Sequence, residues 1–276
     1  MSDIEQAPPG VDITRPSPAR MYDYILGGTE NYEIDRKAAE TVRASMPDLE
    51  DAAWANRGFL QRSVRWLAEQ GIRQFIDIGA GLPTRNNTHE AAQAVAPDAR
   101  VLYADNDPMV AAHAKTLLAG SSGTAFITAD FRDPEGLLGQ EEAMALIDFS
   151  KPAGLLLVAV THFVPDEDDP WGVVGRYMSR LAPGSYLALS SITSERQPDK
   201  AVDTVQAVYS KSSTGAVRVR TRAAIDRFFT GLEIVPAYEG APAELSYVGQ
   251  WGADDPDAAD SDGSRWGYCA VGRKKA

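Results

Sequence analysis

The sequence predicts an α/β fold in which a mostly parallel sheet is covered by helices on both faces. Short apolar runs suited to buried strands lie at 74–78, 100–104, 124–128, 154–160 and 186–191. Helical stretches separate most of these runs, which is typical of parallel sheets because a crossover must return the chain to the same edge. Two further strand-like stretches, 232–236 and 266–271, are joined by a long loop, which permits an antiparallel last strand.

Helical patterns also precede the first strand. One runs from Ala19 to about Ser45 around a break at Gly27 and Gly28, and a second runs from about Asn56 to Glu69. Residues before Ala19 include four prolines and show little periodicity. We therefore expect three parts: a flexible arm (1–18), an N-terminal helical lid (19–55) and a core (56–276).

Composition argues against several classes of protein. A formal net charge of −12 over 276 residues disfavours a nucleic-acid partner, because such partners are bound by clustered Lys and Arg. Cys269 is the single cysteine, so neither an internal disulfide nor a cysteine-based zinc site can form, which favours a reducing compartment. The longest apolar run, 153–160, is far shorter than the roughly 18 residues of a membrane span.

The first ten residues, MSDIEQAPPG, lack the basic and apolar regions of a secretion signal, so we expect a cytoplasmic protein. The acidic stretch 253–263 does not follow the spacing of a calcium loop. A solvated surface loop is the preferred interpretation, and we expect no metal site. Nothing in the sequence indicates an oligomeric state.

The first predicted strand runs into Gly79-Ala80-Gly81, a turn that can bring backbone N–H groups against a nucleoside-type cofactor. A dinucleotide fingerprint requires a third glycine, but Thr84 stands in its place. Asp77, at the end of the strand, would repel a pyrophosphate and complement a sulfonium or ammonium group. S-adenosylmethionine carries both of these cations.

The next two strands also end in acids. Asp105 lies about 24 residues beyond Gly81, close to the interval at which an acid meets ribose hydroxyls, although proteins that bind NAD use an acid there too. Asp130 could accept the exocyclic amine of adenine, and Phe131 could cover the ring. Each acid could instead only cap a turn or helix. Their recurrence in three successive turns favours a shared site.

Longer motifs give a resemblance. The segments RPSPARMYDYILGGTENYEIDRKAAE, ANRGFLQRSVRWLAEQGIRQFIDIGAGLPT, YADNDPMV and LLLVAVTHFVPDEDDP, followed by LAPGSYLALS, cover much of the chain in order. With them the sequence resembles a family of S-adenosylmethionine-dependent methyltransferases first described as a domain of unknown function in actinomycete-type proteins. The segments QWGADDPDAADSDG and 193–213 depart from the family's pattern, which leaves substrate contacts there open.

The resemblance implies a class I methyltransferase fold of the Rossmann-like type: a seven-stranded sheet with an antiparallel last strand, and N-terminal helices over the cofactor. By position, it implies a set of cofactor-binding residues: Asp77, Gly79 and Gly81 in the first motif, Pro83 after it where many such enzymes have glycine, Asp105 and Asn106 at the ribose and adenine edge, and Asp130 and Phe131 in the adenine pocket.

The end of the fourth strand bears on catalysis. There Val160 and Thr161 are expected beside the cofactor, and His162, one of three histidines, is the candidate general base. A histidine that only hydrogen-bonds the neighbouring loop is the alternative. His89 could contact the methionine end of the cofactor or pack at a helix start, and Arg57 could pair with the cofactor's carboxylate or lie on the surface.

The N-terminal helical region offers a hinged lid. Tyr22 and Tyr24 stand beside the glycine pair Gly27 and Gly28, which combines an aromatic contact surface with a flexible backbone. Packing of one helix onto the core is the alternative role for both tyrosines.

Together these features predict an S-adenosylmethionine-dependent methyltransferase that acts on a small-molecule acceptor and releases S-adenosylhomocysteine. A non-catalytic protein that binds S-adenosylmethionine stays open as an alternative, and a nicotinamide-dependent oxidoreductase is disfavoured by the missing third glycine.

Overall fold

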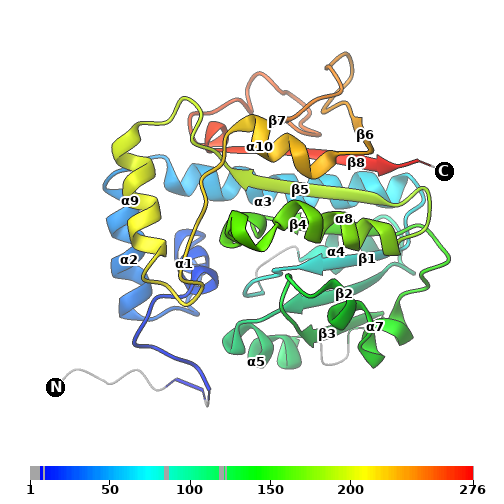
Figure 1. The fold of residues 1–276 in the computed structure, drawn as a ribbon, viewed down its shortest axis with the longest axis horizontal. Helices are drawn as coiled ribbons and strands as arrows, with labels where there is room; N and C mark the ends of the chain where they lie inside the picture. Colours follow the sequence, from blue (N-terminus) through cyan, green and yellow to red (C-terminus); the bar gives the residue numbers. More distant parts are fainter. Residues whose placement is uncertain (1–6, 9, 84–86, 118–120, 122, 276) are drawn as a thin grey trace.

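The computed structural model describes residues 7–8, 10–83, 87–117, 121 and 123–275 (Figure 1). The strands are β1 (Gln74–Ile78), β2 (Arg100–Asp105), β3 (Thr124–Thr128), β4 (Gly154–Val158), β5 (Tyr186–Ile192), β6 (Leu232–Val235), β7 (Ser246–Tyr247) and β8 (Gly267–Lys274). The helices are α1 (Pro18–Ile25), α2 (Glu33–Arg43), α3 (Leu49–Glu69), α4 (Thr88–Gln93), α5 (Pro108–Leu117), α6 (Pro134–Leu138), α7 (Glu141–Leu146), α8 (Pro170–Arg180), α9 (Asp199–Tyr209) and α10 (Arg222–Asp226). Short 3₁₀ turns are η1 (Thr161–Phe163), η2 (Asp166–Asp168), η3 (Arg227–Phe229) and η4 (Ser264–Trp266).

The sheet has the strand order β3-β2-β1-β4-β5-β8-β6. Strands β1 to β5 pair with one another in parallel, whereas β8 runs antiparallel to both β5 and β6. The predicted fold class is therefore confirmed. The two-residue β7 pairs with β8 as well, which adds one short strand to the seven that were expected.

Several predicted boundaries were wrong, among them the end of the last strand, which is Lys274 instead of residue 271. The fourth strand ends at Val158 instead of residue 160, because Ala159 adopts a φ of 58° and turns the chain out of the sheet. The helix expected from about residue 56 begins at Leu49, where the acidic residues Glu50 and Asp51 occupy its first turn and complement the helix dipole.

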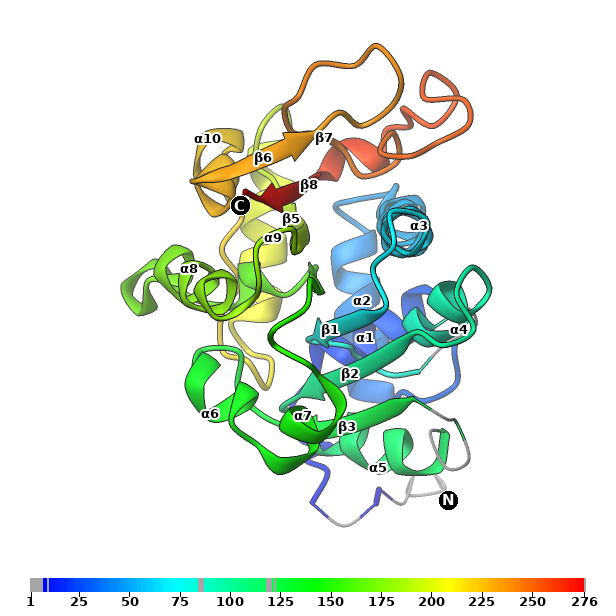
Figure 2. The same ribbon diagram turned by 90° about the vertical axis from the view of Figure 1, so that its right-hand side faces the viewer.

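Helices cover both faces of the sheet, as Figure 2 shows in an almost edge-on view. On one face α3 and α4 pack on the sheet, with Phe59 and Phe75 among the buried side chains. On the other face α6, α7 and α8 enclose a second core that includes Leu155 and Tyr177. Burial of each such side chain stabilises the folded state by roughly 1.5–3 kcal/mol. The two cores therefore hold the strands, and with them the strand ends, in fixed positions.

A third layer lies beyond the carboxyl ends of the parallel strands. There α1, α2 and α9 group together at the end of the sheet toward which the arrowheads of β1, β2 and β5 point (Figure 1). Their small core includes Met21, Val42, Val205 and Trp266. The helices thereby form a cap over the strand ends.

The cap is anchored by the buried carboxylate of Asp35. It accepts hydrogen bonds from the backbone N–H groups of Ser17 and Tyr32, both at 2.9 Å, and from Nε of Arg20 at 2.7 Å. The Oγ of Ser17 in turn donates to Oδ2 of Asp107 at 2.6 Å. The C-terminal end of the predicted arm is thus tied to the core, while residues 1–6 and 9 lie outside the described residues.

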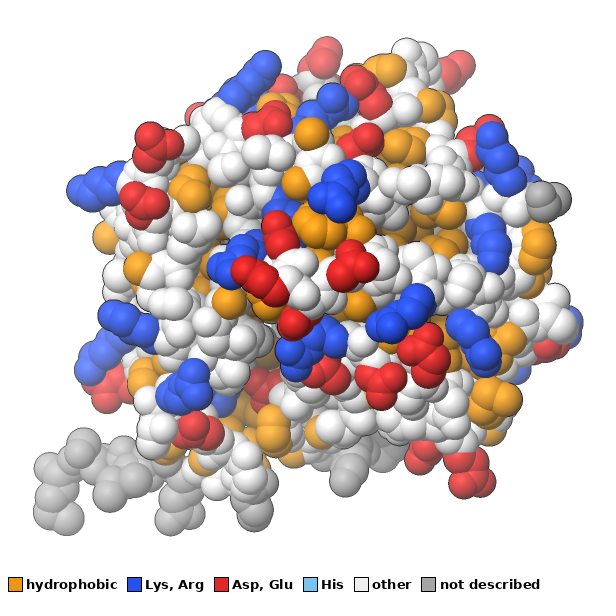
Figure 3. All heavy atoms as spheres, viewed as in Figure 1, with side chains coloured by type: hydrophobic (Ala, Val, Ile, Leu, Met, Phe, Trp, Pro, Cys, Tyr) orange, Lys and Arg blue, Asp and Glu red, His pale blue; other side chains and the backbone are white. Residues whose placement is uncertain are grey.

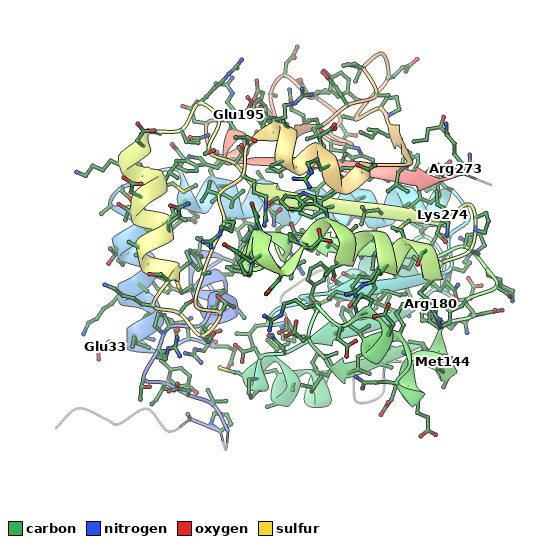
Figure 4. The ribbon with its side chains drawn as sticks, viewed as in Figure 1. Glu33, Met144, Arg180, Glu195, Arg273 and Lys274 are labelled. Carbon is green, nitrogen blue, oxygen red and sulfur yellow. The ribbon has the colours of Figure 1, made fainter. Side chains whose placement is uncertain are left out.

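At the opposite end of the sheet, Lys274 fastens the last strand to a helix (Figure 4). Its Nζ donates to the carbonyls of Met178 and Leu181, both at 2.7 Å. These carbonyls belong to the end of α8 and would otherwise lack helical partners. The antiparallel β8 is therefore fixed at its carboxyl end.

Acidic and basic side chains are interspersed over the face shown in Figure 3. Among the described residues, no helix combines the length and apolarity needed to cross a bilayer.

Candidate active site

A cavity of about 710 Å³ lies at the carboxyl ends of the parallel strands, beneath the helical cap. This volume is within the range of about 300–1,000 Å³ found for small-molecule sites. Most of the residues singled out in the sequence line it: Tyr22, Arg57, Asp77, Gly79, Gly81, Asp105, Asn106, Asp130, Phe131, Val160 and His162. The structure thus brings together side chains from both predicted parts, the lid and the core.

The two glycines of the first turn have different reasons to be glycine. Both adopt positive φ, 71° at Gly79 and 66° at Gly81. A Cβ at Gly79 would lie 2.5 Å from Cγ2 of Val160, so this position is filled by a neighbouring strand end. A Cβ at Gly81 would meet nothing within 4 Å. The backbone open to a ligand is therefore at Gly81, and the close approach at Gly79 serves packing.

Asp105 organises the same turn. Its Oδ2 accepts the N–H of Gly81 and its Oδ1 accepts the N–H of Asp107, both at 2.9 Å. Burial raises the pKa of Asp105, and these backbone hydrogen bonds oppose the rise. Each carboxylate oxygen can still accept a further hydrogen bond. The residue therefore combines the turn-capping role with a capacity to bind ligand hydroxyls.

Asp77 is a second buried carboxylate that lines the cavity. Its Oδ2 accepts the hydroxyl of Thr88 at 2.6 Å. Burial raises the pKa of Asp77 to about 6, against the opposing effects of the Thr88 hydrogen bond and of the charge on Arg57. A buried carboxylate of this kind is stabilised in its ionised form by a ligand cation.

At the end of β3, Asp130 is paired with Arg132. Oδ2 of Asp130 lies 2.6 Å from Nη2 of Arg132, and this hydrogen bond holds the pKa of Asp130 below its usual range. Phe131 stacks on Tyr177, with ring centroids 5.7 Å apart. Arg132 lines the cavity and was missed in the sequence, although its position two residues after an acid was a signal for this pair.

His162 lies in η1, three residues after the strained Ala159. Its ring is 4.4 Å from that of Phe163, between centroids, and its Nδ1 is buried without a hydrogen-bond partner in the described protein. Burial lowers the pKa of His162 to about 3, and the charge of Arg220 adds to the effect. The imidazole is therefore neutral at physiological pH.

Arg220 fixes the loop that carries His162. It is buried, and it donates to the carbonyl of Thr161 at 2.9 Å and to that of Val164 at 2.7 Å. It also pairs with Asp166 at 2.7 Å. No sequence pattern identified Arg220, because the loop it holds is more than 50 residues away.

A chain of neutral polar groups crosses the cavity wall. Tyr22 was named in the sequence, whereas its partners Asn56 and Ser190 were missed. Ser190 donates to Oδ1 of Asn56 at 2.6 Å, and Nδ2 of Asn56 donates to the hydroxyl of Tyr22 at 3.1 Å. The Tyr22 hydroxyl donates to the carbonyl of Ala53 at 2.9 Å. Tyr209 lines the same region, where burial raises its pKa to about 12. Both tyrosines are therefore neutral hydrogen-bonding groups.

Six residues named in the sequence do not line the cavity: Tyr24, Gly27, Gly28, Pro83, His89 and Thr161. Tyr24 donates to Glu40 on the exposed side of the cap. Nδ1 of His89 lies 2.8 Å from the hydroxyl of Tyr103, which fits the helix-packing alternative. Gly28 packs against the carboxylate of Asp23.

With this geometry established, comparison with known proteins decides the family. A family model described as S-adenosyl methyltransferase matches residues 4–275. The chain belongs to this family. A search of curated proteins gave no match.

Solved structures similar to this S-adenosyl methyltransferase include two of at least 40% sequence identity. A candidate methyltransferase from Thermobifida fusca YX is 42% identical, with a TM-score of 0.89 over 99% of this chain and 100% of the other. A DUF574 family protein from Streptomyces avermitilis MA-4680 is 40% identical, with a TM-score of 0.86 over 95% of this chain and 98% of the other. A mitomycin 7-O-methyltransferase, 16% identical with a TM-score of 0.50 over 94% of this chain and 69% of the other, shares the fold alone.

Proposed function

We propose that this methyltransferase transfers the methyl group of S-adenosylmethionine to a small-molecule acceptor and releases S-adenosylhomocysteine. The observation that carries the proposal is the pairing of Asp105 with the open Gly81 turn in the wall of a cavity of about 710 Å³. In open α/β sheets, ligands bind at this edge of the strands.

The residues of the cavity fit the parts of the cofactor. Asp105 and Asn106 suit the ribose hydroxyls, and Phe131 offers an apolar ring to adenine. Asp77 and Arg57 offer opposite charges to the amino and carboxylate groups of the methionine end. When bound, the cofactor supplies the methyl group on a positively charged sulfur and leaves as a neutral thioether.

We assign to His162 the role of taking a proton from the acceptor. With a pKa of about 3 it is a weak base, yet it is unprotonated throughout the physiological range. An acceptor oxygen becomes far more acidic as its bond to the methyl carbon forms, so a late proton transfer to a weak base remains favourable. Arg220 keeps the imidazole in place by fixing the carbonyls of Thr161, the first residue of η1, and of Val164, which follows η1.

The helical cap would exclude water during the transfer. Pro18 and Ala19 line the cavity, and the neighbouring Ser17 is hydrogen-bonded to Asp107 beside the proposed adenosine position. Dry sites strengthen the electrostatic contacts that orient the reactants. We expect the cap to open for exchange of cofactor and product.

Calorimetry and a turnover assay test the proposal together. In calorimetry, S-adenosylhomocysteine should bind saturably. In the turnover assay, the protein should convert S-adenosylmethionine to S-adenosylhomocysteine when a metabolite fraction that contains the acceptor is added. His162→Ala should slow release by about 100-fold or more if His162 is the general base, with little effect on cofactor binding.

His113→Ala, which changes a histidine paired with Glu30 outside the cavity, serves as the matched control. Tight binding without any turnover across the fractions would indicate the non-catalytic alternative. Saturable binding of NADH, followed by fluorescence, would indicate an oxidoreductase instead.

A further inference from the structure

The cavity has one charged end and one uncharged end. Its charged lining side chains come from α3, from β1 and β2, and from the segments that follow β2 and β3. They are Arg57, Asp77, Asp105, Asp107, Asp130 and Arg132. Among the described lining residues that come from α1, α2, β5, α9, η4 and the segment 213–217, none carries a charge. The proposed cofactor position accounts for the charged end only.

The uncharged end is mostly apolar. Met46, Phe163, Val205, Val217 and Trp266 line it from five separate segments of the chain. A charged molecule placed there would lose its hydration without contacting an oppositely charged side chain of the lining, which is costly in a buried site. The charge of Arg220, which acts on His162 from outside the lining, is already paired with Asp166 and with two backbone carbonyls. This end therefore selects for an uncharged molecule.

Two buried polar groups at this end have no partner in the described protein. They are Oγ of Ser191, in a residue only 2% exposed, and Nδ1 of His162, in a residue 8% exposed. Both residues line the cavity: Ser191 lies in β5 near its carboxyl end, and His162 lies in η1, which follows the adjacent parallel strand β4. Buried polar groups are nearly always hydrogen-bonded, so the pair calls for a ligand group or water that can donate and accept.

We propose that the acceptor is an uncharged, largely apolar molecule with a hydroxyl group, held at this end by Ser191 and His162. Ser191 donates to the hydroxyl oxygen, and Nδ1 of His162 accepts its proton in the tautomer that is protonated at Nε2. On transfer, an oxygen lone pair forms the bond to the methyl carbon, the carbon–sulfur electron pair stays on sulfur, and the hydroxyl proton passes to His162. The inference rests on the proposed function.

Binding to the protein saturated with S-adenosylhomocysteine tests the charge selection. The probes are naphthalenes of matched shape: 2-naphthol, 2-methylnaphthalene, 2-naphthoate and 2-naphthylmethylammonium. We expect 2-naphthol to bind at least tenfold more tightly than either ion. Equal or tighter binding of an ion would overturn the proposal, and so would failure of both neutral probes to bind while S-adenosylhomocysteine binds.

A serine pair tests the hydrogen bond. Ser191→Ala should weaken 2-naphthol binding by about 2- to 12-fold, the effect of one neutral hydrogen bond, and leave 2-methylnaphthalene unchanged. Ser264→Ala is the matched control, because Ser264 also has a buried Oγ without a partner in the described protein but does not line the cavity. An unchanged affinity of Ser191→Ala for 2-naphthol would overturn the assignment of Ser191. Failure of S-adenosylhomocysteine itself to bind would instead refute the proposed function on which the inference depends.

Discussion

Alanine substitutions at the two glycines of the first turn should have different consequences. At Gly79 the added Cβ would lie 2.5 Å from Cγ2 and 2.8 Å from Cβ of Val160, which forces a shift in a packed region. Overpacking of this kind costs roughly 1–3 kcal/mol. The positive φ of 71° adds about 1–2 kcal/mol for a residue with a side chain. We therefore expect Gly79→Ala to lose about 2–5 kcal/mol of the free energy of unfolding.

Gly81→Ala should lose only the backbone contribution, about 1–2 kcal/mol, because nothing lies within 4 Å of the added Cβ. That methyl group would instead occupy space on the wall of the proposed cofactor site. We expect affinity for S-adenosylhomocysteine to fall at least tenfold. Thus Gly79→Ala is the larger stability defect, and Gly81→Ala is the binding defect.

Urea unfolding followed by circular dichroism measures the first effect, and calorimetry measures the second. The double variant Gly79→Ala/Val160→Ala should regain part of the lost stability, because the Cγ2 contact is removed. The reasoning is refuted if Gly81→Ala is as unstable as Gly79→Ala, or if it binds S-adenosylhomocysteine as tightly as the unmodified chain.

Three further predictions follow from the buried polar groups. Because burial raises the pKa of Asp77 to about 6, the folded state binds the proton more tightly than the unfolded state, and stability falls as the pH rises from about 4 to 6. Asp77→Asn should remove this loss of stability, which reaches about 3 kcal/mol at pH 7, and should also weaken cofactor binding. Urea unfolding across this pH range measures the effect. An Asp77→Asn variant whose stability changes with pH as that of the unmodified chain does would contradict the prediction. Ser17→Ala should speed release of S-adenosylhomocysteine by about fivefold in stopped-flow experiments, since one hydrogen bond from the cap is lost, and an unchanged rate would count against an opening cap. Arg220→Lys should lower kcat while leaving the Kd for S-adenosylhomocysteine within about twofold of the unmodified chain, because a lysine cannot hold the carbonyls of Thr161 and Val164 together. A fall in kcat accompanied by an equal loss of affinity for S-adenosylhomocysteine would disprove this positioning role.

The strand ends could be predicted from the sequence because they follow from local patterns. Buried parallel strands appear as apolar runs, and the acids and glycines that follow them must meet at one edge of the sheet. Asp77, Gly81 and Asp105 were found in this way, and all three line the cavity. The different role of Gly79 was not visible, since it depends on Val160, about 80 residues later.

The uncharged end of the cavity could not be predicted in the same way. Ser190 and Asn56 are 134 residues apart, and only the packing of α3 on β5 brings them into contact. Ser191 lies at the end of the predicted strand 186–191, but no motif marked it as a site residue, and Tyr209 lies in a segment whose pattern is weak. Tertiary packing therefore determines this part of the site, whereas strand-to-helix turns determine the part that faces the proposed cofactor.

The central claim is that the turn after β1, together with Asp105, binds an adenosyl cofactor. Calorimetric titration with S-adenosylhomocysteine tests it most directly, using Asp105→Ala beside Asp133→Ala, which removes a helix-capping carboxylate that does not line the cavity. We predict one saturable site, an affinity at least tenfold lower for Asp105→Ala, and an unchanged affinity for Asp133→Ala. Absence of binding to the unmodified chain, or equal affinities for all three proteins, would contradict the claim.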